Sequence, residues 1–353
     1  MGASSRMRML QYLPWLQQAG LEVTVQSLLS DDLLTGRYRH GGYGLDALSA
    51  AYYSRVRTLM QRGQFDVLWI EKEALPWMPL WLERGLLQGI PYVLDYDDAV
   101  FHRYDMHPNP WLRRLYGRRL DGLIAGAALV VGGNNYLAQR ARDAGAPWVE
   151  LVPTVVDLVR YAPKSDALGN GIEACSGSGE VPRIVWIGSP TTVHYLELLR
   201  EPLQTLAAKV RFKLRVIGGG HIDLPGVDVE SVAWFEATEA DSIRVCDIGV
   251  MPLLDSLWER GKCGYKLIQY MASGLPVVAS NVGVNPEIVQ QGQGGFLANT
   301  GSEWVAGLDR LLNDVTLRTQ MGQLGRQRVE RAYCIQHTGP QVAELLRFAA
   351  RGS

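Results

Sequence analysis

The sequence predicts an α/β protein with two domains, each built on a mostly parallel β-sheet. Its 353 residues exceed the roughly 100–200 residues that one hydrophobic core usually organises. Short apolar runs alternate with longer amphipathic segments, which is typical of parallel strands joined by crossover helices. A Gly/Ser-rich stretch without apolar periodicity separates two such series, and it predicts a linker over residues 164–180.

The apolar runs place the expected strands. They cover residues 21–28, 65–70, 91–97, 128–133 and 148–154 in the first half, and 183–189, 212–220, 246–253 and 275–280 in the second. Apolar spacing of three and four residues then predicts helices over 302–314, 316–333 and 341–350. We therefore expect an N-terminal domain over 1–163, a C-terminal domain over 181–336, and a final helical segment, 337–353, that could cross back to the first domain.

The beginning of the chain departs from this rhythm. It opens "MGASSRMRMLQYLPWLQQAG", a Gly/Ser loop and a helix, where such a domain normally begins with a strand. We expect the first strand of the N-terminal domain to be missing. Either the sheet is one strand short, or the true N-terminus lies upstream of Met1.

Composition argues against several function classes. The net charge of −1 gives no overall attraction to nucleic acid. The four cysteines are scattered, without CxxC or Cys/His spacing, which indicates a reducing compartment and no structural zinc. No signal peptide opens the chain, and the longest apolar run, 123–131, falls short of the roughly 20 residues of a membrane span. We expect a cytoplasmic protein.

The stretch "RGKCGYKLIQYMASGLPVVASNVGVNPEIV" combines glycines, lysines and a helix start. Functional residues of α/β domains gather where parallel strands end and loops lead into helices. Here an expected strand ends at Leu253 and a helix begins near Gly264. Gly261 and Gly264 let a ligand approach the backbone, while Lys262, Lys266 and the helix N-terminus supply positive charge. The pattern predicts a diphosphate site, although solvated lysines on a loop are the alternative.

The segment "KLIQYMASGLPVVASNVGVNPEIV" resembles the nucleotide-sugar site of retaining glycosyltransferases of the GT-B fold, in the family often called family four. This resemblance extends loosely over nearly the whole chain. It implies two Rossmann-like domains facing a cleft, the first for an acceptor and the second for a nucleotide diphosphate sugar, with no cofactor besides this donor substrate. The form "GKCGYKLIQYMASGLPVVAS" resembles a bacterial subgroup. That implies a hexosyltransferase for a glycan or lipid-linked acceptor in surface polysaccharide or glycolipid assembly.

The sequence also departs from the family pattern. Most members carry two glutamates around this helix, and alignment on "MASG" puts Gly261 and Gln269 in their places. Gln269 can still bond ribose hydroxyls through its amide, whereas Gly261 cannot replace a carboxylate, for which Glu259 could substitute. Members also carry an Arg and a Lys after the first strand of the second domain. "GSPTTVHYLELL" has neither, so the resemblance implies that Lys262 and Lys266 hold the donor phosphates.

The donor is expected to meet residues that end strands or begin the helix. These are Gly188, Ser189, Gly218, Gly219, Gly261, Lys262, Gly264, Tyr265, Lys266 and Gln269. The segment "GASSRMR" resembles the family's first glycine-rich loop, which implies that Ser5 and Arg6 lie on the acceptor side. The Arg6 guanidinium could hold a phosphate through two hydrogen bonds. A solvated terminal arginine is the alternative.

"LDYDDAVFHRYD" ends an expected strand with Asp95, Asp97 and Asp98. In the resembling family this strand end faces the sugar, often with a His where Asp97 falls. The resemblance implies that Asp97 or Asp98 accepts a bond from a sugar hydroxyl or orients the acceptor, and both are catalytic candidates together with Lys262 and Lys266. Aspartates that only form the turn are the alternative. A metal site is disfavoured because no further carboxylate or His cluster supports it.

Aromatic and basic residues suggest contact with an anionic membrane at its inner face. They are Trp77 and Trp81, followed by Arg113, Arg114, Arg118 and Arg119 on an expected helix. A core helix with a solvated basic face is the alternative.

Two other functions remain open at the level of sequence. A nucleotide-sugar epimerase shares the two-domain architecture. A non-catalytic partner of another transferase would fit the missing carboxylate at Gly261.

Overall fold

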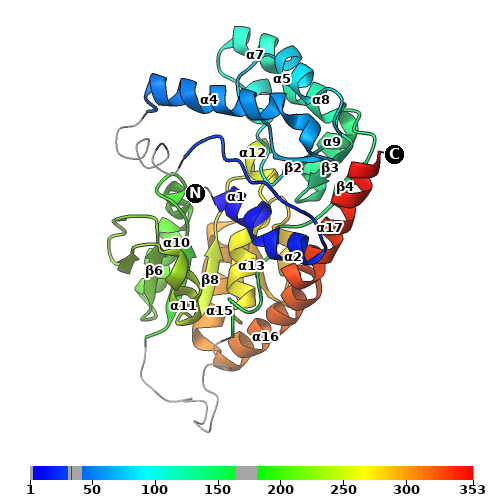
Figure 1. The fold of residues 1–353 in the computed structure, drawn as a ribbon. Helices are drawn as coiled ribbons and strands as arrows, with labels where there is room; N and C mark the ends of the chain where they lie inside the picture. Colours follow the sequence, from blue (N-terminus) through cyan, green and yellow to red (C-terminus); the bar gives the residue numbers. More distant parts are fainter. Residues whose placement is uncertain (1–2, 31–32, 34–41, 164–180, 353) are drawn as a thin grey trace. The chain divides into compact units, whose positions relative to one another are not determined.

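The computed structural model describes residues 3–30, 33, 42–163 and 181–352 (Figure 1). The predicted linker, 164–180, lies outside the described residues. The chain divides into two compact units. The first contains Met1–Thr154, Gly261–Cys263 and Thr338–Ser353, and the second contains Val155–Arg260 and Gly264–His337. The predicted domain bounds, 1–163 and 181–336, stay predictions.

The first unit is built on a four-stranded parallel sheet in the order β1-β2-β3-β4. The strands are β1 (Leu68–Glu71), β2 (Tyr92–Tyr96), β3 (Leu129–Gly132) and β4 (Val149–Leu151). All residues of the inner strand β2 are buried, as expected for a parallel strand covered on both faces. The helices are α1 (Ala3–Arg8), α2 (Leu13–Gln18), α4 (Leu45–Met60), α5 (Leu80–Leu87), α6 (His102–Asp105), α7 (Pro110–Tyr116), α8 (Arg119–Ile124) and α9 (Asn135–Asp143).

Four of the five strands predicted in the first half are confirmed, with shorter bounds. The fifth, over 21–28, is wrong, because this segment forms no strand. One of its residues, Gln26, forms hydrogen bonds with side chains of α4 instead. Gln26 donates to Thr58 Oγ1 at 2.8 Å, and its carbonyl accepts from Arg55 at 3.0 Å. The loop expected at the start of the chain is also wrong for residues 3–8, which form α1.

The second unit has a six-stranded parallel sheet in the order β10-β9-β8-β5-β6-β7. The strands are β5 (Arg183–Ile187), β6 (Lys213–Ile217), β7 (Asp228–Val232), β8 (Ile248–Met251), β9 (Val277–Ser280) and β10 (Gly295–Ala298). The helices are α10 (Arg200–Ala207), α11 (Glu239–Arg244), α12 (Leu257–Arg260), α13 (Tyr265–Ala272), α14 (Asn285–Val289), α15 (Gly301–Asn313) and α16 (Val315–Ala332). The strand order reverses between β5 and β8, and ligands of such sheets bind outside the carboxyl ends of the strands at this switch point.

The four strands predicted in the second half are confirmed, again with shorter bounds. The edge strands β7 and β10 were not predicted. The sequence of β7, "DVESV", alternates charged or polar residues with valine, and its outer residues stay partly exposed. β10 has four residues and follows directly on glycines. Neither segment offers the continuous apolar run that marks an inner parallel strand.

The three predicted C-terminal helices are confirmed as α15, α16 and α17 (Ile335–Arg351). From Thr338 onward α17 belongs to the first unit, where it packs on α2 (Figure 1). Thr338 Oγ1 lies 3.0 Å from Tyr12 Oη, Gly339 lies against the Trp15 ring, and Arg347 donates to the Ala19 carbonyl. Within the described residues, no helix combines the length and the apolar character that a bilayer crossing needs.

Candidate functional site

A cluster of charged side chains lies at the carboxyl ends of β1 and β2 in the first unit. Lys72 Nζ lies 3.1 Å from Glu71 Oε1 and 2.9 Å from Asp97 Oδ1. Ser5 Oγ donates to Glu71 Oε2 at 2.5 Å. The structure thus brings Ser5 and Asp97 to the same cluster. The sequence analysis missed Glu71 and Lys72, although "IEKE" ends a strand that neighbours the aspartate-bearing one.

The two aspartates of the cluster differ electrostatically. Burial raises the pKa of Asp98, and the negative charge of Asp97 raises it further against the effect of Lys262. Burial also acts to raise the pKa of Asp97, but the Lys72 ammonium and a hydrogen bond from Ser4 outweigh it, so that this pKa is lowered. Asp97 is therefore the ionised carboxylate of the pair, and Asp98 is the more readily protonated.

Asp95 lies beneath this cluster and forms a buried ion pair. Arg8 Nε lies 2.7 Å from Asp95 Oδ1, and both side chains are about 2% exposed or less. Arg8 also donates to the Val152 carbonyl at 2.8 Å. Asp95 therefore ties α1 to β2. Arg6 lies on the same helix and is partly buried.

The segment Gly261–Cys263 belongs to the first unit. Cys263 Sγ donates to the Asp97 carbonyl at 3.1 Å, and Asn134 Nδ2 donates to the Lys262 carbonyl at 3.0 Å. Lys262 Nζ lies 3.7 Å from Asp98 Oδ1. The structure thus places Lys262 beside Asp98, while Lys266 belongs to the second unit.

The packing around Gly261 leaves no room for the glutamate that the family resemblance suggests at this position. A Cβ added at Gly261 would overlap the backbone and side chain of Ala99, so that a glutamate does not fit in this packing. Glu259, the suggested substitute, is buried in the second unit, where it accepts from Tyr195 Oη at 2.5 Å and from Ser256. Its carboxylate is thus already hydrogen-bonded inside the protein.

Lys266 lies in the first turn of α13, after the loop that follows β8. Its Nζ lies 5.7 Å from the centroid of the buried Trp186 ring, within the range of a cation–π contact. Gly264 caps the helix with a left-handed φ of 66°, and no side-chain hydrogen bond caps the first turn. Tyr265 packs partly buried against the core of the unit. A helix N-terminus, a glycine and a lysine thus meet at this point of the second unit.

Gln269 faces the interior of the second unit. Its side chain is 2% exposed, and Nε2 donates to Tyr161 Oη at 2.7 Å. Tyr161 in turn donates to Glu239, which also accepts from the Trp234 indole at 2.5 Å. The described contacts of Gln269 therefore stabilise the unit, and its ribose contact stays a prediction.

The glycines that end β5 and β6 allow the two strand ends to approach each other closely. Gly188 donates to the Ile217 carbonyl at 3.0 Å. Gly218 has a φ of 75°, and a Cβ there would overlap the Gly188 carbonyl, whereas Gly219 lies against Trp186. Ser189 Oγ lies 2.7 Å from Thr191 Oγ1, so that hydroxyl groups follow β5.

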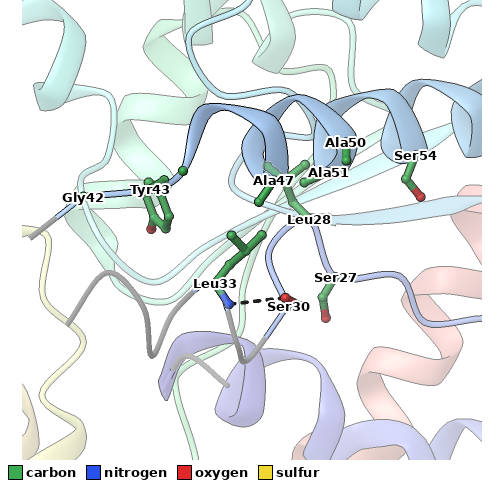
Figure 2. Close-up of a pocket in the computed structure, with 11 residues that line it drawn as sticks. Ser27, Leu28, Ser30, Leu33, Gly42, Tyr43, Ala47, Ala50, Ala51 and Ser54 are labelled. Carbon is green, nitrogen blue, oxygen red and sulfur yellow. Dashed lines mark hydrogen bonds between the residues drawn. The ribbon is translucent and has the colours of Figure 1, made fainter. Parts of the chain in front are cut away.

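A separate cavity of about 1030 Å³ lies in the first unit (Figure 2). Helix α4 forms one side of it through Ala47, Ala50, Ala51 and Ser54, and Leu28 lies across from them. None of the predicted site residues lines this cavity. Among the residues that the structure describes, no three His, Cys, Asp or Glu side chains gather where they could share a metal ion.

Large apolar side chains are exposed on α5 and α7. Trp81 is 74% exposed, Trp111 78% and Leu115 72%. Trp77 is less exposed because its ring packs on Tyr104 at 4.7 Å. Three of the predicted arginines, Arg113, Arg114 and Arg118, are exposed nearby on α7 and the residues after it. The sequence analysis missed Trp111 and Leu115, which read as part of an amphipathic helix.

The assignment of Arg119 to this basic surface is wrong. Its side chain is buried and bonded to both Glu73 and Glu83, and to the carbonyls of Leu75 and Met78. The ion pairs neutralise its charge inside the unit. Arg119 therefore anchors the loop after β1.

Two protein-family models match the chain. Residues 5–154 match a glycosyl transferase 4-like domain, and residues 181–314 match the domain of group 1 glycosyl transferases. The chain is 30% identical over 189 residues to sulfoquinovosyl transferase SQD2 of Arabidopsis thaliana, covering 50% of this chain and 35% of that protein. It is 23% identical over 303 residues to a phosphatidyl-myo-inositol mannosyltransferase of Mycobacterium leprae, covering 80% and 74%. The chain thus spans about a third of the plant relative and three quarters of the bacterial one.

Solved structures share the fold. A glycosyltransferase of Rickettsia africae has a TM-score of 0.67 at 13% identity, covering 100% of this chain and 97% of that one. The HepE protein of Anabaena in complex with UDP-glucose has a TM-score of 0.65 at 15% identity, covering 95% and 88%. With two parallel-sheet α/β units and both family matches, the chain belongs to the GT-B glycosyltransferases of the group 1, or family four, type.

Proposed function

We propose that this protein transfers a sugar from a nucleoside diphosphate sugar to an acceptor hydroxyl. The observation that carries the proposal is the helix start at the switch point of the second sheet. There Gly264 opens α13, and Lys266 lies in its first turn after β8. Helix N-terminal N–H groups and an ammonium suit a diphosphate. The HepE neighbour, solved with UDP-glucose, supports this class of donor.

In this proposal the second unit holds the donor and the first unit the acceptor. The residues that directly follow β5 and β6 on the donor side are Gly188, Ser189, Gly218 and Gly219. Those at the start of α13 are Gly264, Tyr265 and Lys266. On the acceptor side, Asp97 and Asp98 receive sugar hydroxyls. Ser5 and Arg6 belong to the same side. For Lys262, which lies beside Asp98, the phosphate contact stays a prediction.

We infer that transfer retains the anomeric configuration of the donor. Family four relatives are retaining enzymes by the resemblance stated above, and their leaving diphosphate helps to deprotonate the acceptor. The protein then supplies position and charge at the β-phosphate, for which Lys266 and the N–H groups of α13 are suited. NMR of the product linkage tests this inference, and an inverted anomer would contradict it.

The acceptor is proposed to be a glycan or lipid-linked sugar in bacterial surface polysaccharide or glycolipid assembly. The mannosyltransferase relative carries phosphatidyl-myo-inositol in its name, which supports a lipid-linked acceptor. The acceptor would then lie at a membrane surface.

We therefore also propose peripheral contact with the inner face of a membrane through α5 and α7. Trp81, Trp111 and Leu115 would enter the lipid headgroup region, and the three exposed arginines would meet anionic lipids. Liposome flotation with and without anionic lipid tests this contact. Trp111→Ser should reduce recovery with anionic vesicles, whereas Phe348→Ser, at an exposed aromatic on α17, should not. Equal recovery of wild type with and without anionic lipid would contradict the proposal.

One experiment tests the function itself. A thermal-shift screen over UDP, GDP, ADP, CMP and dTDP sugars selects the donor, and release of the nucleotide is then measured with Lys266→Met as the control. Slow donor hydrolysis by the wild type and its loss in the variant would support a transferase. A changed sugar without nucleotide release would show an epimerase. Binding without any turnover would point to a non-catalytic partner.

A further inference from the structure

The chain makes an unusually tight turn directly after β1. Lys72 has a φ of 64°, in the left-handed region that residues with side chains rarely adopt. The Glu73 N–H donates to the Glu71 carbonyl at 2.7 Å, which closes a three-residue γ-turn around Lys72. This form of the γ-turn, with positive φ at its centre, is rare and strained. Such strain persists where the surroundings hold it, and often at functional sites.

The turn sends two adjacent side chains to different partners. Glu73 accepts from Tyr104 Oη at 2.8 Å and pairs with the buried Arg119. Lys72 instead reaches toward Asp97, and its side chain is only 17% exposed. The backbone still pairs with β2 at this point, because the Lys72 N–H donates to the Asp95 carbonyl at 2.9 Å. The direction of the Lys72 side chain is thus fixed by the γ-turn and by the backbone hydrogen bond to β2.

The Lys72 ammonium is shared by two carboxylates that are themselves hydrogen-bonded. Ser5 donates to Glu71, and Ser4 donates to Asp97. The Asp97 side chain is 12% exposed, so it keeps a path to a ligand. Burial of an ammonium group costs folding free energy unless the group is paired with a carboxylate. Here the ion pair with Lys72 fixes the Asp97 carboxylate, which lies on the acceptor side of the proposed reaction.

We propose that Lys72 is a positioning residue that holds Asp97 ionised and oriented as the hydrogen-bond acceptor for a sugar hydroxyl. The contact to Asp97 follows from the geometry, whereas the sugar hydroxyl rests on the function proposed above. Lys72 itself need not touch the substrate. Its effect passes through the charge and the position of the Asp97 carboxylate.

Several other groups also face Asp97. They are Glu71 from β1, Arg8 and Ser4 from α1, Asp95 and Asp98 from β2 and the loop after it, and Cys263 from the segment 261–263. Arg103 from α6 and Lys262 act on the neighbouring Asp98. Arg8 is already paired with Asp95, and Lys262 lies beside Asp98. Removal of Lys72 therefore leaves Asp97 among carboxylates without its nearest cation.

The direct test is a carboxyl ¹³C NMR titration of protein labelled at aspartate, with Asp97→Asn to assign the signal. Loss of a cation at this distance should raise the pKa of Asp97 in Lys72→Met by about one to three units. Lys72→Arg keeps the charge and should restore most of the low pKa. Lys72→Gly suits the positive φ, so it should fold as wild type and still show the raised pKa.

The kinetic test is the pH dependence of kcat/KM in the same variants. In Lys72→Met the acid limb should move to higher pH by the shift seen in the titration. In that limb kcat/KM falls about tenfold for each unit of pKa shift, and it recovers toward wild type at higher pH. A structural role alone would give a loss that is equal at every pH.

The outcomes separate this inference from the function it uses. If the Asp97 carboxyl titrates alike in wild type and Lys72→Met, the inference that Lys72 keeps this carboxylate ionised is overturned. An unshifted pH profile in an active enzyme would overturn its use in the reaction. A wild type that turns over no nucleotide sugar would overturn the proposed function and the sugar contact with it, while the titration still decides the pairing.

Discussion

Charged side chains at the carboxyl edges of the two sheets have different kinds of partners. In the first unit, cations meet carboxylates directly, as Lys72 meets Glu71 and Asp97. In the second unit, the buried carboxylate Glu239 accepts hydrogen bonds from neutral donors, a tyrosine hydroxyl and an indole, while Arg160 lies 3.9 Å away from it. The described contact of Lys266 there is with an aromatic ring.

This difference matches two kinds of ligand. Ionised carboxylates fixed by ion pairs are good acceptors for hydroxyl groups, which suits a sugar. Backbone N–H groups, hydroxyls and a lysine at a helix start suit an anion. The comparison therefore predicts that substitutions at the first edge act through buried charge, and that those at the second act through affinity for phosphate.

The largest expected effect is on stability, at the buried pair beneath the first edge. Arg8→Met leaves Asp95 buried without its cation, which should cost about 3–5 kcal/mol of unfolding free energy. The matched change in the second unit is Arg215→Met. Arg215 Nε lies 2.9 Å from Oε2 of the partly exposed Glu230, so the loss of this ion pair should cost about 1 kcal/mol or less of unfolding free energy. Urea unfolding followed by tryptophan fluorescence measures both.

A double variant sharpens this prediction. Arg8→Met combined with Asp95→Leu removes both charges and should recover much of the loss. If Arg8→Met alone is as stable as wild type, the pair does not contribute as described.

The next effect is on turnover, at the second edge. Negative charge grows on the leaving diphosphate in the transition state, so Lys266→Ala should lower kcat by about two orders of magnitude. Lys266→Met should behave alike, because it keeps the stem and loses only the charge. Nucleotide affinity should also fall, while the melting temperature changes little. Lys262→Ala should show the same pattern more weakly.

Measurements of nucleotide affinity and initial rate in these variants test whether the two lysines bind the donor phosphates. Wild-type turnover and affinity in both Lys262→Ala and Lys266→Ala would contradict a phosphate role, and Arg6 would then be the next candidate.

The smallest effect concerns Gly261 in the segment Gly261–Cys263. Gly261→Ala places a Cβ against Ala99 and should cost about 1–3 kcal/mol through overpacking. Gly63→Ala, where nothing lies within 4 Å of the added carbon, should be neutral or slightly stabilising. Thermal unfolding compares them, and equal melting temperatures would mean that Ala99 yields without cost.

The inner strands could be predicted from sequence because two-sided burial demands a continuous apolar run. The segment 21–28 alternates like a strand, but alternation alone does not provide a neighbouring strand to pair with, and Gln26 bonds to α4 instead. The edge strand β7 was not predicted because its partial exposure permits charged and polar residues. The edge strand β10 was not predicted because it has only four residues and begins at a glycine.

The candidate site was predictable only in part. Asp97 and Asp98 stood out because they cluster at the end of an apolar strand that faces the sugar in the resembling family. Lys72 was not predicted, because the direction of its side chain depends on a turn with positive φ. Glycine or asparagine usually marks such a turn in a sequence, and neither is present at this position. Arg119 read as a surface residue because its partner Glu73 lies 46 positions away in the chain.

The segment Gly261–Cys263 limits how this protein can be divided for study. Its three residues belong to the first unit, while the chain on both sides of them belongs to the second. A fragment that stops at Thr154 would match the first family model almost completely, yet it would lack this segment and α17. The Trp15 ring and the backbone at Gly133, against which Cys263 packs, would then face water. Such a fragment should aggregate on expression, so genetic truncation at the family boundary is a poor route to an isolated acceptor domain.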